Sequence, residues 1–427
     1  MPDTTDTEAV RPPSPWRLFA PCPRGLETAL AAELQALGAD DCRPVAGGVA
    51  FAGDRALAYR ANLWSRLASR ILREIGTRRY RGPEDLYKLA AGVTWEQYFD
   101  ARHTLRVDTS ATRSPLRSLN FATLRVKDAI VDRLRERTGQ RPSIDTRTPD
   151  ARVWLFVEMQ QATLYLDLSG EPLFKRGWRS GRDDGGEAPL KENLAAGLLT
   201  LAGWTPDQTL VDPFCGSGTL AIEAACLGCD IAPGLTRGFG FEKLLDHDPA
   251  LWAGLRSAAV QRAQAGMADQ QLRIVATDID AAAIARARRN QSRAGLPEAA
   301  IAWQQADATR LRPPFDTPGL MIANPPYGER LGAHTFSGDT HTASGDTHAA
   351  TMRAVGATLK AHWAGWQVWL LSADPELPRQ LAMKENRRTP LFNGALECRF
   401  FSFRVFAAAA SGEPSGTPSR PGRPSPR

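Results

Sequence analysis

The sequence predicts an α/β protein whose second half forms a doubly wound parallel sheet and whose first half mixes α and β structure. From residue 209 onward, continuous apolar strands alternate with helical segments, which is typical of a parallel sheet covered by helices on both faces. The first half instead combines short strands, amphipathic helices and a dense run of arginines. With 427 residues, the chain is long enough for two to three domains of about 150 residues each.

The first half is expected to form a mixed α and β region. The spacing of apolar residues predicts helices over 25–37, 55–64 and 120–138, the last with a dense Arg and Lys face. Strand patterns occur at 18–22, 49–52, 103–110, 153–159 and 162–169. A short polar turn separates the last two strands, so we expect them to form a hairpin.

The second half has the strand and helix alternation of a doubly wound sheet. Strands are expected within 209–214, 273–280, 301–309, 320–328, 366–373 and 397–406, and helices within 216–228 and 281–295. In such sheets, ligands bind at the carboxyl ends of the strands, beside the point where the strand order reverses. Candidate site residues are therefore sought just after each strand.

Positive charge is concentrated in the first half. The whole chain carries a net charge of +6. Between Arg55 and Arg147 there are about 20 Lys and Arg against about 10 Asp and Glu, more than the net excess of the molecule. A general preference for Arg in this sequence would explain why Arg is used in place of Lys. It would not explain why basic residues outnumber acidic residues in one region. A polyanion such as a nucleic acid is the expected partner.

The remaining composition argues against membrane, secreted and metal-binding proteins. No apolar run approaches the ~18 residues of a membrane span, and the N-terminal segment lacks the pattern of a signal peptide. Six cysteines are too few for a disulfide framework. Cys226 and Cys229 form an isolated CxxC among apolar residues and are interpreted as buried thiols, with no metal. We expect a soluble, cytoplasmic protein.

Three segments have the composition of irregular structure. Residues 1–15 and 409–427 are rich in Pro, Ser, Thr and Gly and are expected to be disordered tails. Residues 333–350 are a low-complexity insertion in which SGDTH occurs twice, at 337–341 and 344–348. Its three histidines could indicate a metal site, but neighbouring Gly, Ser and Thr offer no packing to fix ligands, so a surface loop is favoured.

The segment LVDPFCGSGTLAIEAA (210–225) has the pattern of a ligand cradle. A buried strand should end at Asp212, Gly216 and Gly218 permit a tight turn, and a helix should begin near Thr219. The spacing matches neither the dinucleotide motif G-x-G-x-x-G nor the P-loop. Asp212 would repel a phosphate there, whereas it would attract a cationic amino-acid group.

Two further acids follow the next two strands. Asp278, in VATDID, stands where a carboxylate can accept hydrogen bonds from both hydroxyls of a ribose. Asp307, in ADA, can accept from an adenine amino group. Either acid alone could equally be a loop residue or a helix N-cap. Three acids at three successive strand ends favour a binding site.

ANPPYG (323–328) is the most specific pattern in the sequence. Asn324 offers a side-chain oxygen and Pro325 a free carbonyl, because two successive prolines hold an extended backbone without N–H donors. These two acceptors can hold a planar exocyclic amine, and Tyr327 can stack on its base, which contributes about 1–3 kcal/mol. The alternative is a proline-rich turn with a surface tyrosine.

With these motifs, the second half resembles class I S-adenosylmethionine-dependent methyltransferases, specifically the amino methyltransferases with the signature [DNS]-P-P-[YFW]. The resemblance implies that Asp212, Gly216 and Gly218 hold the methionine end of the cofactor, Asp278 its ribose and Asp307 its adenine. The implied cofactor set also includes Pro213, Thr219, Ile279 and Ala308. The implied catalytic set that clamps the target base is Asn324, Pro325, Pro326 and Tyr327.

Two segments narrow the resemblance to one family. They look like those of the bacterial 23S ribosomal RNA guanine-N2-methyltransferases and are 175–199 (KRGWRSGRDDGGEAPLKENLAAGLL) and 324–332 (NPPYGERLG). This resemblance implies a Rossmann-like class I methyltransferase domain preceded by an α+β ferredoxin-like and THUMP RNA-binding region. The implied domains are 16–80 (ferredoxin-like), 81–170 (THUMP) and 171–408 (methyltransferase). Some relatives carry a second methyltransferase domain. Since this sequence ends after one, no second modification is expected.

The implied activity is methylation of a guanosine N2 amine in 23S rRNA or in a large-subunit assembly intermediate. Because the sequence shows no surplus apolar stripe, we expect a monomer. A paired guanine hides its amine, so the target must be exposed or flipped. The alternatives are a tRNA guanine-N2-methyltransferase, a DNA adenine methyltransferase that shares N-P-P-Y, and a noncatalytic RNA-binding assembly factor.

Overall fold

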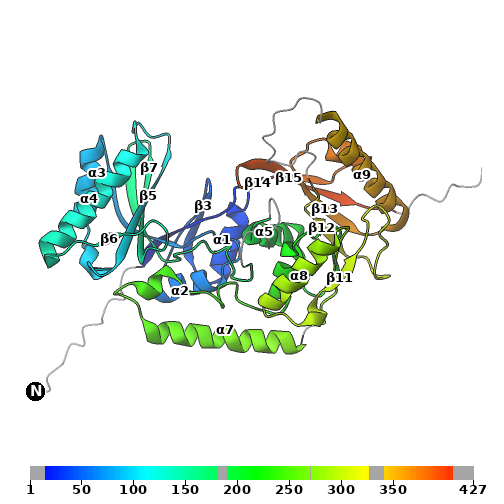
Figure 1. The fold of residues 1–427 in the computed structure, drawn as a ribbon, viewed down its shortest axis with the longest axis horizontal. Coiled ribbons are helices and arrows are strands. Elements are labelled where there is room, and N and C mark those ends of the chain that lie inside the picture. Colours follow the sequence, from blue (N-terminus) through cyan, green and yellow to red (C-terminus); the bar gives the residue numbers. More distant parts are fainter. Residues whose placement is uncertain (1–14, 180–189, 270, 327–340, 407–427) are drawn as a thin grey trace, which may run out of the picture.

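The protein was analysed as a computed structural model that describes residues 15–179, 190–269, 271–326 and 341–406. The expected disordered tails and residues 333–340 of the insertion lie outside these ranges. Two sheets follow one another along the long axis of the molecule, the first sheet at the end formed by residues 15–169 and the second at the opposite end (Figure 1).

Within the described residues, the first sheet holds eight strands in the order β2-β3-β1-β4-β8-β7-β5-β6. They are β1 (Trp16–Pro21), β2 (Asp40–Val45), β3 (Gly48–Gly53), β4 (Leu72–Arg79), β5 (Thr104–Thr112), β6 (Ser143–Ile144), β7 (Ala151–Glu158) and β8 (Gln161–Asp167). β4 pairs with β8 along its whole length but with β1 only through Leu72 and Arg73. This short pairing joins a three-stranded and a five-stranded part into one sheet.

Four α-helices accompany the described part of the first sheet. They are α1 (Glu27–Ala36), α2 (Arg55–Trp64), α3 (Pro83–Ala91) and α4 (Leu119–Thr138), with a 3-10 turn at Trp95–Gln97. Asp54 and Ser118 cap α2 and α4, since their side chains accept the N–H groups of Leu57 and Phe121. The helices expected over 25–37, 55–64 and 120–138 are thereby confirmed, as is the β7–β8 hairpin.

Within the described residues, the second sheet holds seven strands in the order β11-β10-β9-β12-β13-β15-β14. They are β9 (Leu210–Asp212), β10 (Ile274–Asp278), β11 (Ala302–Gln305), β12 (Leu320–Ala323), β13 (Gln367–Ser372), β14 (Arg387–Asn393) and β15 (Leu396–Arg404). The five strands from β11 to β13 are parallel. The order reverses between β9 and β12, which places the expected ligand site at their carboxyl ends.

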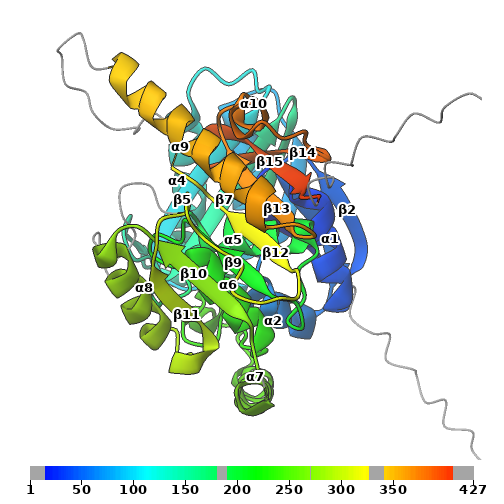
Figure 2. The same ribbon diagram turned by 90° about the vertical axis from the view of Figure 1, so that its right-hand side faces the viewer.

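Helices cover both faces of the second sheet (Figure 2). The helices of this half are α5 (Glu192–Ala202), α6 (Thr219–Gly228), α7 (Pro249–Asp269), α8 (Ala281–Arg293), α9 (His341–His362) and α10 (Leu377–Leu381), with 3-10 turns at Gly240–Lys243 and Glu298–Ala300. Of these, α7 lies away from the sheet (Figure 2). Successive strand residues alternate between the two cores, as the period of two requires. Leu320 and Ile322 belong to the core that includes α6 and α8, whereas Met321 packs with α9.

Two expectations about the second half need correction. The sheet is not wholly parallel, because β15 runs antiparallel to both β13 and β14. A two-residue turn beginning at Gly394, whose φ is +67°, connects β14 and β15 directly and so reverses the chain. The second SGDTH copy was expected in a loop, but residues 341–350 form the first turns of α9. This helix continues into Met352, Val355 and Leu359, which are buried and anchor it.

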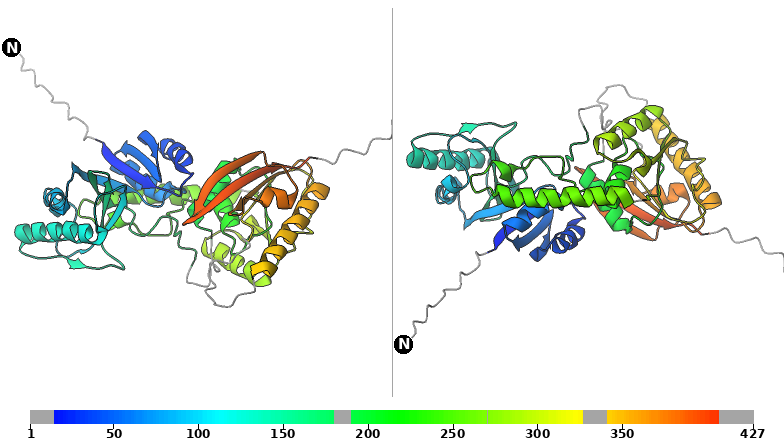
Figure 3. Two further views of the ribbon diagram at one scale, coloured as in Figure 1. Left: turned by 90° about the horizontal axis from the view of Figure 1, so that it is seen from above. Right: turned by 90° about the horizontal axis from the view of Figure 1, so that it is seen from below.

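A buried ionic network joins the two halves of the chain. The Arg176 guanidinium lies 3.1 Å from the Glu223 carboxylate on α6 and donates to the backbone carbonyl of Arg66. The Arg66 guanidinium donates to the carbonyl of Ile231, while the Glu33 carboxylate on α1 accepts from the N–H of Arg66. α7 also runs along the side of both halves, next to α2 (Figure 3). These contacts hold the first sheet in a defined position relative to the second.

Candidate active site

The carboxyl ends of β9, β10 and β12 meet at the point where the strand order reverses. Asp212 is the last residue of β9 and lies beside Ala276 of β10. Met321 of β12 pairs with Val211, so Asn324 leaves the sheet at the same edge as Asp212. Three of the expected site segments are therefore neighbours in the fold.

Asp212 is a buried carboxylate with one hydrogen bond from the protein. It is 3% exposed, and its Oδ1 accepts the N–H of Phe214 at 3.2 Å. Burial, reinforced by the negative charge of Asp278, raises the pKa of Asp212 to about 8. Because the charge of Asp278 acts on this position, a cation at this edge would be stabilised and a phosphate would be repelled.

The glycine loop after β9 is held against β10. The N–H of Cys215 donates to the carbonyl of Thr277 at 2.9 Å, and the N–H of Gly216 donates to Asp278 Oδ2 at 2.9 Å. Gly216 has a φ of +53° and nothing within 4 Å of where a Cβ would lie, so its surroundings are open. A ligand can approach the backbone closely at this position.

Gly218 has a structural role in the same loop. Its φ is +86°, and a Cβ there would lie 2.6 Å from the Trp303 ring and 3.0 Å from Ala287. The backbone can pass between β11 and α8 only because no side chain is present. Thr219 then begins α6 and is buried.

Asp278 ends β10 and is half-buried. Its Oδ1 accepts the N–H of Asp280, whose own side chain caps α8 through the N–H groups of Ala282 and Ala283. Of the two acids at this strand end, Asp280 is therefore the helix cap, which leaves Asp278 as the carboxylate directed to the glycine loop. Ile279 between them is 69% exposed.

Asp307 and Ala308 follow β11. The N–H of Ala306 donates to the carbonyl of Asp278 at 3.0 Å, so this turn lies directly beside the end of β10. Asp307 Oδ1 accepts from the Thr309 hydroxyl at 2.7 Å and from its N–H at 2.9 Å, and these bonds lower the pKa of Asp307. The half-buried carboxylate is ionised at neutral pH.

The Asn-Pro-Pro segment leaves the end of β12. Asn324 is half-buried, Pro325 is buried and Pro326 is exposed, so the segment passes from the core to the surface within three residues. Tyr327, which the sequence places in the base clamp, lies outside the described residues. The structure thus places the two expected amine acceptors, Asn324 and Pro325, at the sheet edge that carries Asp212.

Two residues near the site were not singled out from the sequence. The Arg179 guanidinium donates to the Thr219 hydroxyl and to the carbonyl of Leu190, and it lies 3.5 Å from the Glu192 carboxylate. Arg179 and Glu192 both lie in the 175–199 segment, whose sequence resembles a methyltransferase family but assigns neither residue a role. They connect the chain entering the second half to the first residue of α6.

The polar groups at this edge of the sheet fit a nucleoside that carries an amino acid better than they fit a metal ion or a dinucleotide. The open Gly216 backbone, a buried carboxylate with raised pKa and two further strand-end acids offer acceptors for an ammonium group, a ribose and an amino group. Across 15–179, 190–269, 271–326 and 341–406, no three His, Cys, Asp or Glu side chains are arranged to hold a metal ion. Nor does any helix in these ranges have the length and apolarity to cross a bilayer.

The strand order, the glycine loop and the acidic strand ends define a Rossmann-like methyltransferase domain, preceded by an α+β region. Comparison with known families agrees with this domain order. The chain matches the RMKL-like methyltransferase domain over 179–401, the RlmL ferredoxin-like domain over 17–72 and the THUMP domain over 80–167. The chain belongs to the RMKL-like methyltransferase family.

Similar proteins include two named Ribosomal RNA large subunit methyltransferase K/L. The one from Syntrophotalea carbinolica is 43% identical over 402 residues, which are 92% of this chain and 54% of the relative. The one from Aeromonas hydrophila is 40% identical over 410 residues, 91% of this chain and 54% of the relative. The chain therefore spans about half the length of the curated relatives it matches.

Solved structures cover nearly the whole chain. SMU.472, classed as a methyltransferase and crystallised with SAH, superposes with a TM-score of 0.80 at 30% identity, covering 93% of this chain and 100% of that one. A Listeria monocytogenes protein described as an N6-adenine-specific DNA methylase superposes with a TM-score of 0.79 at 30% identity, covering 92% and 96%. TrmN from Thermus thermophilus, at 21% identity and a TM-score of 0.64, shows the same fold.

Proposed function

We propose that this protein transfers a methyl group from S-adenosylmethionine to the N2 amine of a guanosine in 23S ribosomal RNA. The observation that carries the proposal is the placement of Asn324 and Pro325 at the carboxyl end of β12, at the same sheet edge as Asp212 and the Gly216 loop. A pair of amine acceptors thus stands beside a cradle suited to a cationic nucleoside.

In this proposal, the residues after three successive strands hold the cofactor. Asp212 and the backbone of Gly216 and Gly218 receive its methionine end, Asp278 its ribose and Asp307 its adenine. Pro213, Thr219, Ile279 and Ala308 complete this surface. The buried Asp212 fits an ammonium partner because ion pairing would offset the desolvation that raises its pKa. When bound, S-adenosylmethionine supplies an already activated methyl group, so no strong general base is needed.

The catalytic contribution of the protein is alignment of the target amine. Asn324 Oδ1 and the Pro325 carbonyl accept the two hydrogens of the amine, which directs the nitrogen lone pair toward the methyl donor. The ring of Pro326 disfavours a helical conformation at Pro325 and so keeps the backbone extended, and it also removes an N–H donor at this position. Tyr327 is assigned to stacking on the base, by its position in the NPPY motif.

The substrate assignment rests on the arginine-rich THUMP region of the first half and on the names of the similar proteins. The names of the K/L relatives state large-subunit ribosomal RNA as their substrate, and the THUMP match covers residues 80–147 of the arginine-rich region. We propose that this region binds RNA mainly through phosphates. Domain borders near residues 80 and 170, action as a monomer and a cytoplasmic location belong to the same proposal.

Nucleoside mass analysis of ribosomal RNA and tRNA from cells with and without the gene tests the substrate. We expect one N2-methylguanosine to disappear from large-subunit RNA. Loss from tRNA instead would transfer the assignment to a tRNA substrate. Calorimetry of the purified protein with S-adenosylmethionine tests the enzyme assignment separately, because a noncatalytic assembly factor need not bind the cofactor.

A further inference from the structure

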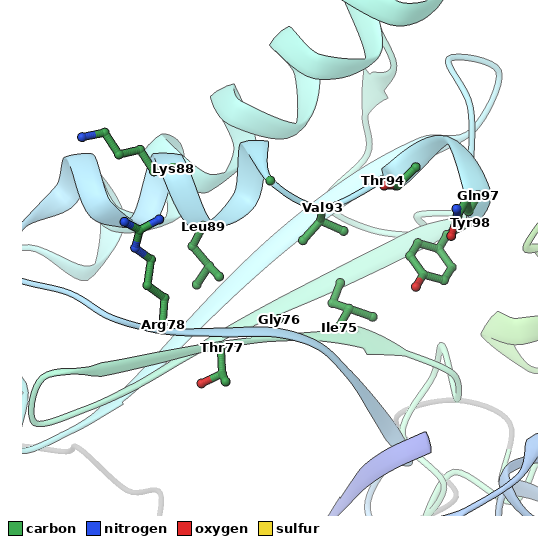
Figure 4. A pocket seen from close by; sticks show the side chains of 11 residues that line it. Ile75, Gly76, Thr77, Arg78, Lys88, Leu89, Val93, Thr94, Gln97 and Tyr98 are labelled. Carbon is green, nitrogen blue, oxygen red and sulfur yellow. The ribbon is translucent and has the colours of Figure 1, made fainter. Parts of the chain in front are cut away.

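A groove of about 560 Å³ opens between β4 and α3, in the end of the molecule opposite the candidate active site (Figures 1 and 4). Its volume is within the range of about 300–1,000 Å³ typical of ligand pockets. It has no part in the proposed methyl transfer, and none of the residues expected at that site lines it.

The groove exists because β4 is irregular at this point. Glu74 pairs with Tyr165 and Gly76 with Leu164, so Ile75 is an extra residue that bulges out of the ladder. Beyond Arg73, β4 pairs only with β8 among the described strands, so its other edge is open. A Cβ at Gly76 would lie 3.4 Å from Leu89 and 3.6 Å from Val93, so the missing side chain leaves room between β4 and α3.

One end of the groove is cationic. Arg78 and Lys88 are exposed and extend toward the same end, from β4 and α3 respectively (Figure 4). Neither makes an ion pair with a carboxylate in the described part of the chain. Two acids of the neighbourhood already have partners: Glu84 pairs with Arg125 and Glu96 with Arg133.

Asp85 is the remaining acid close to this end. Its carboxylate accepts the backbone N–H of Arg81 at 2.8 Å, and the nearby charges of Arg78 and Lys88 help to lower its pKa. One carboxylate faces two cations, so the groove end keeps net positive charge. The exposed side chains of Arg79 and Arg81 extend this charge along the chain beyond the groove.

The rest of the groove is apolar in the middle and polar at the far end. Ile75, Leu89 and Val93 form the floor, and Thr94, Gln97 and Tyr98 close the opposite side (Figure 4). The Gln97 side chain is exposed and carries both a donor and an acceptor. Along the groove, the cationic end suits the phosphate of a nucleotide and the apolar floor suits its base. The amide of Gln97 suits the hydrogen-bonding edge of that base.

We infer that this groove holds an unpaired nucleotide of the RNA substrate, with its phosphate between Arg78 and Lys88 and its base on the apolar floor facing Gln97. The inference rests on the proposed function, since it names where that RNA is held away from the methylated base. An RNA strand fits better than a free nucleotide, because the groove is open along the strand edge and the positive charge continues beyond it. An unpaired base fits because only such a base can leave its stack and lie against side chains.

Binding of a short unstructured oligouridine RNA to the full chain, measured over a series of salt concentrations, tests the inference. Arg78→Ala and Lys88→Ala should each weaken binding about fourfold at physiological salt and reduce the slope of log affinity against log salt by about 0.7. The matched control is Arg43→Ala, which removes an exposed arginine of the edge strand β2, in the three-stranded part and outside the arginine-rich region. It should leave both quantities nearly unchanged.

A second variant probes the base rather than the phosphate. Gln97→Ala should change the preference among oligouridine, oligoadenosine and oligocytidine without changing the salt slope, because it removes no charge. An equal loss in Arg43→Ala and in the groove variants would overturn the inference. So would binding of uridine monophosphate as tight as that of the oligomer, which would identify a free-nucleotide site.

The proposed function is checked in the same preparations. If the native chain binds S-adenosylmethionine and methylates ribosomal RNA while Arg78→Ala and Lys88→Ala bind oligouridine like the native chain, the groove inference fails and the proposed function stands. If the native chain transfers no methyl group to any RNA but loses oligouridine binding in the groove variants, the proposed function fails and the groove remains an RNA site.

Discussion

The N–H of Gly216 donates to Asp278 Oδ2 at 2.9 Å, which ties the loop after β9 to the last residue of β10. Asp278 therefore stands at the proposed ribose position and also fixes the backbone that would receive the methionine end. Its second oxygen, Oδ1, accepts the N–H of Asp280 at 2.9 Å. One carboxylate thus organises two segments of the proposed cofactor site.

Replacing Asp278 should weaken cofactor binding before it affects anything else. Asp278→Ala removes the acceptor for Gly216 and for the ribose, and hydrogen bonds to charged groups are worth about 1.5–3 kcal/mol. We expect S-adenosylmethionine affinity, measured by calorimetry, to fall about 10- to 100-fold. Asp278→Asn, which keeps one acceptor oxygen, should fall less. Unaltered affinity in Asp278→Ala would remove this residue from the ribose role.

The two glycines of the loop should respond differently to substitution. Gly218→Ala adds a Cβ 2.6 Å from the Trp303 ring at a φ of +86°, so both a clash and backbone strain are expected. A loss of about 2–6 kcal/mol of unfolding free energy follows from about 1–3 kcal/mol for each of the two effects. Denaturant unfolding of the purified variant measures it.

Gly216→Ala is the matched comparison for Gly218→Ala. A Cβ there meets nothing within 4 Å, so only the strain of a φ of +53° applies, and the stability should fall less. The new methyl group would instead occupy the open side of the loop and reduce cofactor affinity. If both alanine variants lose the same stability and keep full cofactor affinity, the cradle is placed wrongly.

The strand ends were predictable because their pattern is local. Continuous apolar runs followed by Asp212, Asp278 and Asp307 place each acid after its strand, and the parallel order then brings them to one edge. The Gly216–Asp278 bond was not predictable, because it joins residues 62 apart in the chain. The same holds for Arg179 and Thr219, which are brought together only by the packing of the entering chain on α6.

Low complexity concealed the start of α9. Ser, Gly, Thr and Asp have weak helix propensity, so 341–350 was interpreted as loop. Tertiary packing outweighs propensity here, since Met352, Val355 and Leu359 bury the following turns. Bulges are equally hard to see in a sequence. Nothing in LREIGTRR marks Ile75 as the unpaired residue that opens the groove beside α3.

Asp212 should make the stability of the free protein depend on pH. Burial raises its pKa from 3.8 to about 8, so the folded state keeps a proton that the unfolded chain has lost. Between these two values the unfolding free energy should therefore decrease as pH rises. Asp212→Asn, which resembles the neutral acid, should flatten this dependence in denaturant titrations at pH values across that window.

Cofactor binding should show the opposite trend at Asp212. An ammonium group requires the ionised carboxylate, so affinity should rise with pH up to about 8 and binding near neutral pH should release a proton. Calorimetry in buffers of different ionisation enthalpy measures that proton. Asp212→Asn should bind more weakly and release none. If Asp212→Asn released as many protons as the native protein, the released proton would come from another group.

Asn324→Ala separates the target clamp from the cofactor cradle. Asn324 leaves β12 after the last paired residue, and in the proposed site its side-chain oxygen accepts a hydrogen bond from the amine of the target base. Its loss should leave S-adenosylmethionine affinity within about twofold, whereas methyl transfer to RNA should fall about 100-fold because the amine is no longer aligned. Single-turnover assays with saturating cofactor measure the transfer step directly. Pro326→Ala, which keeps both acceptors, is the control and should lose much less. A variant that fails to bind the cofactor would instead show that Asn324 supports the cradle.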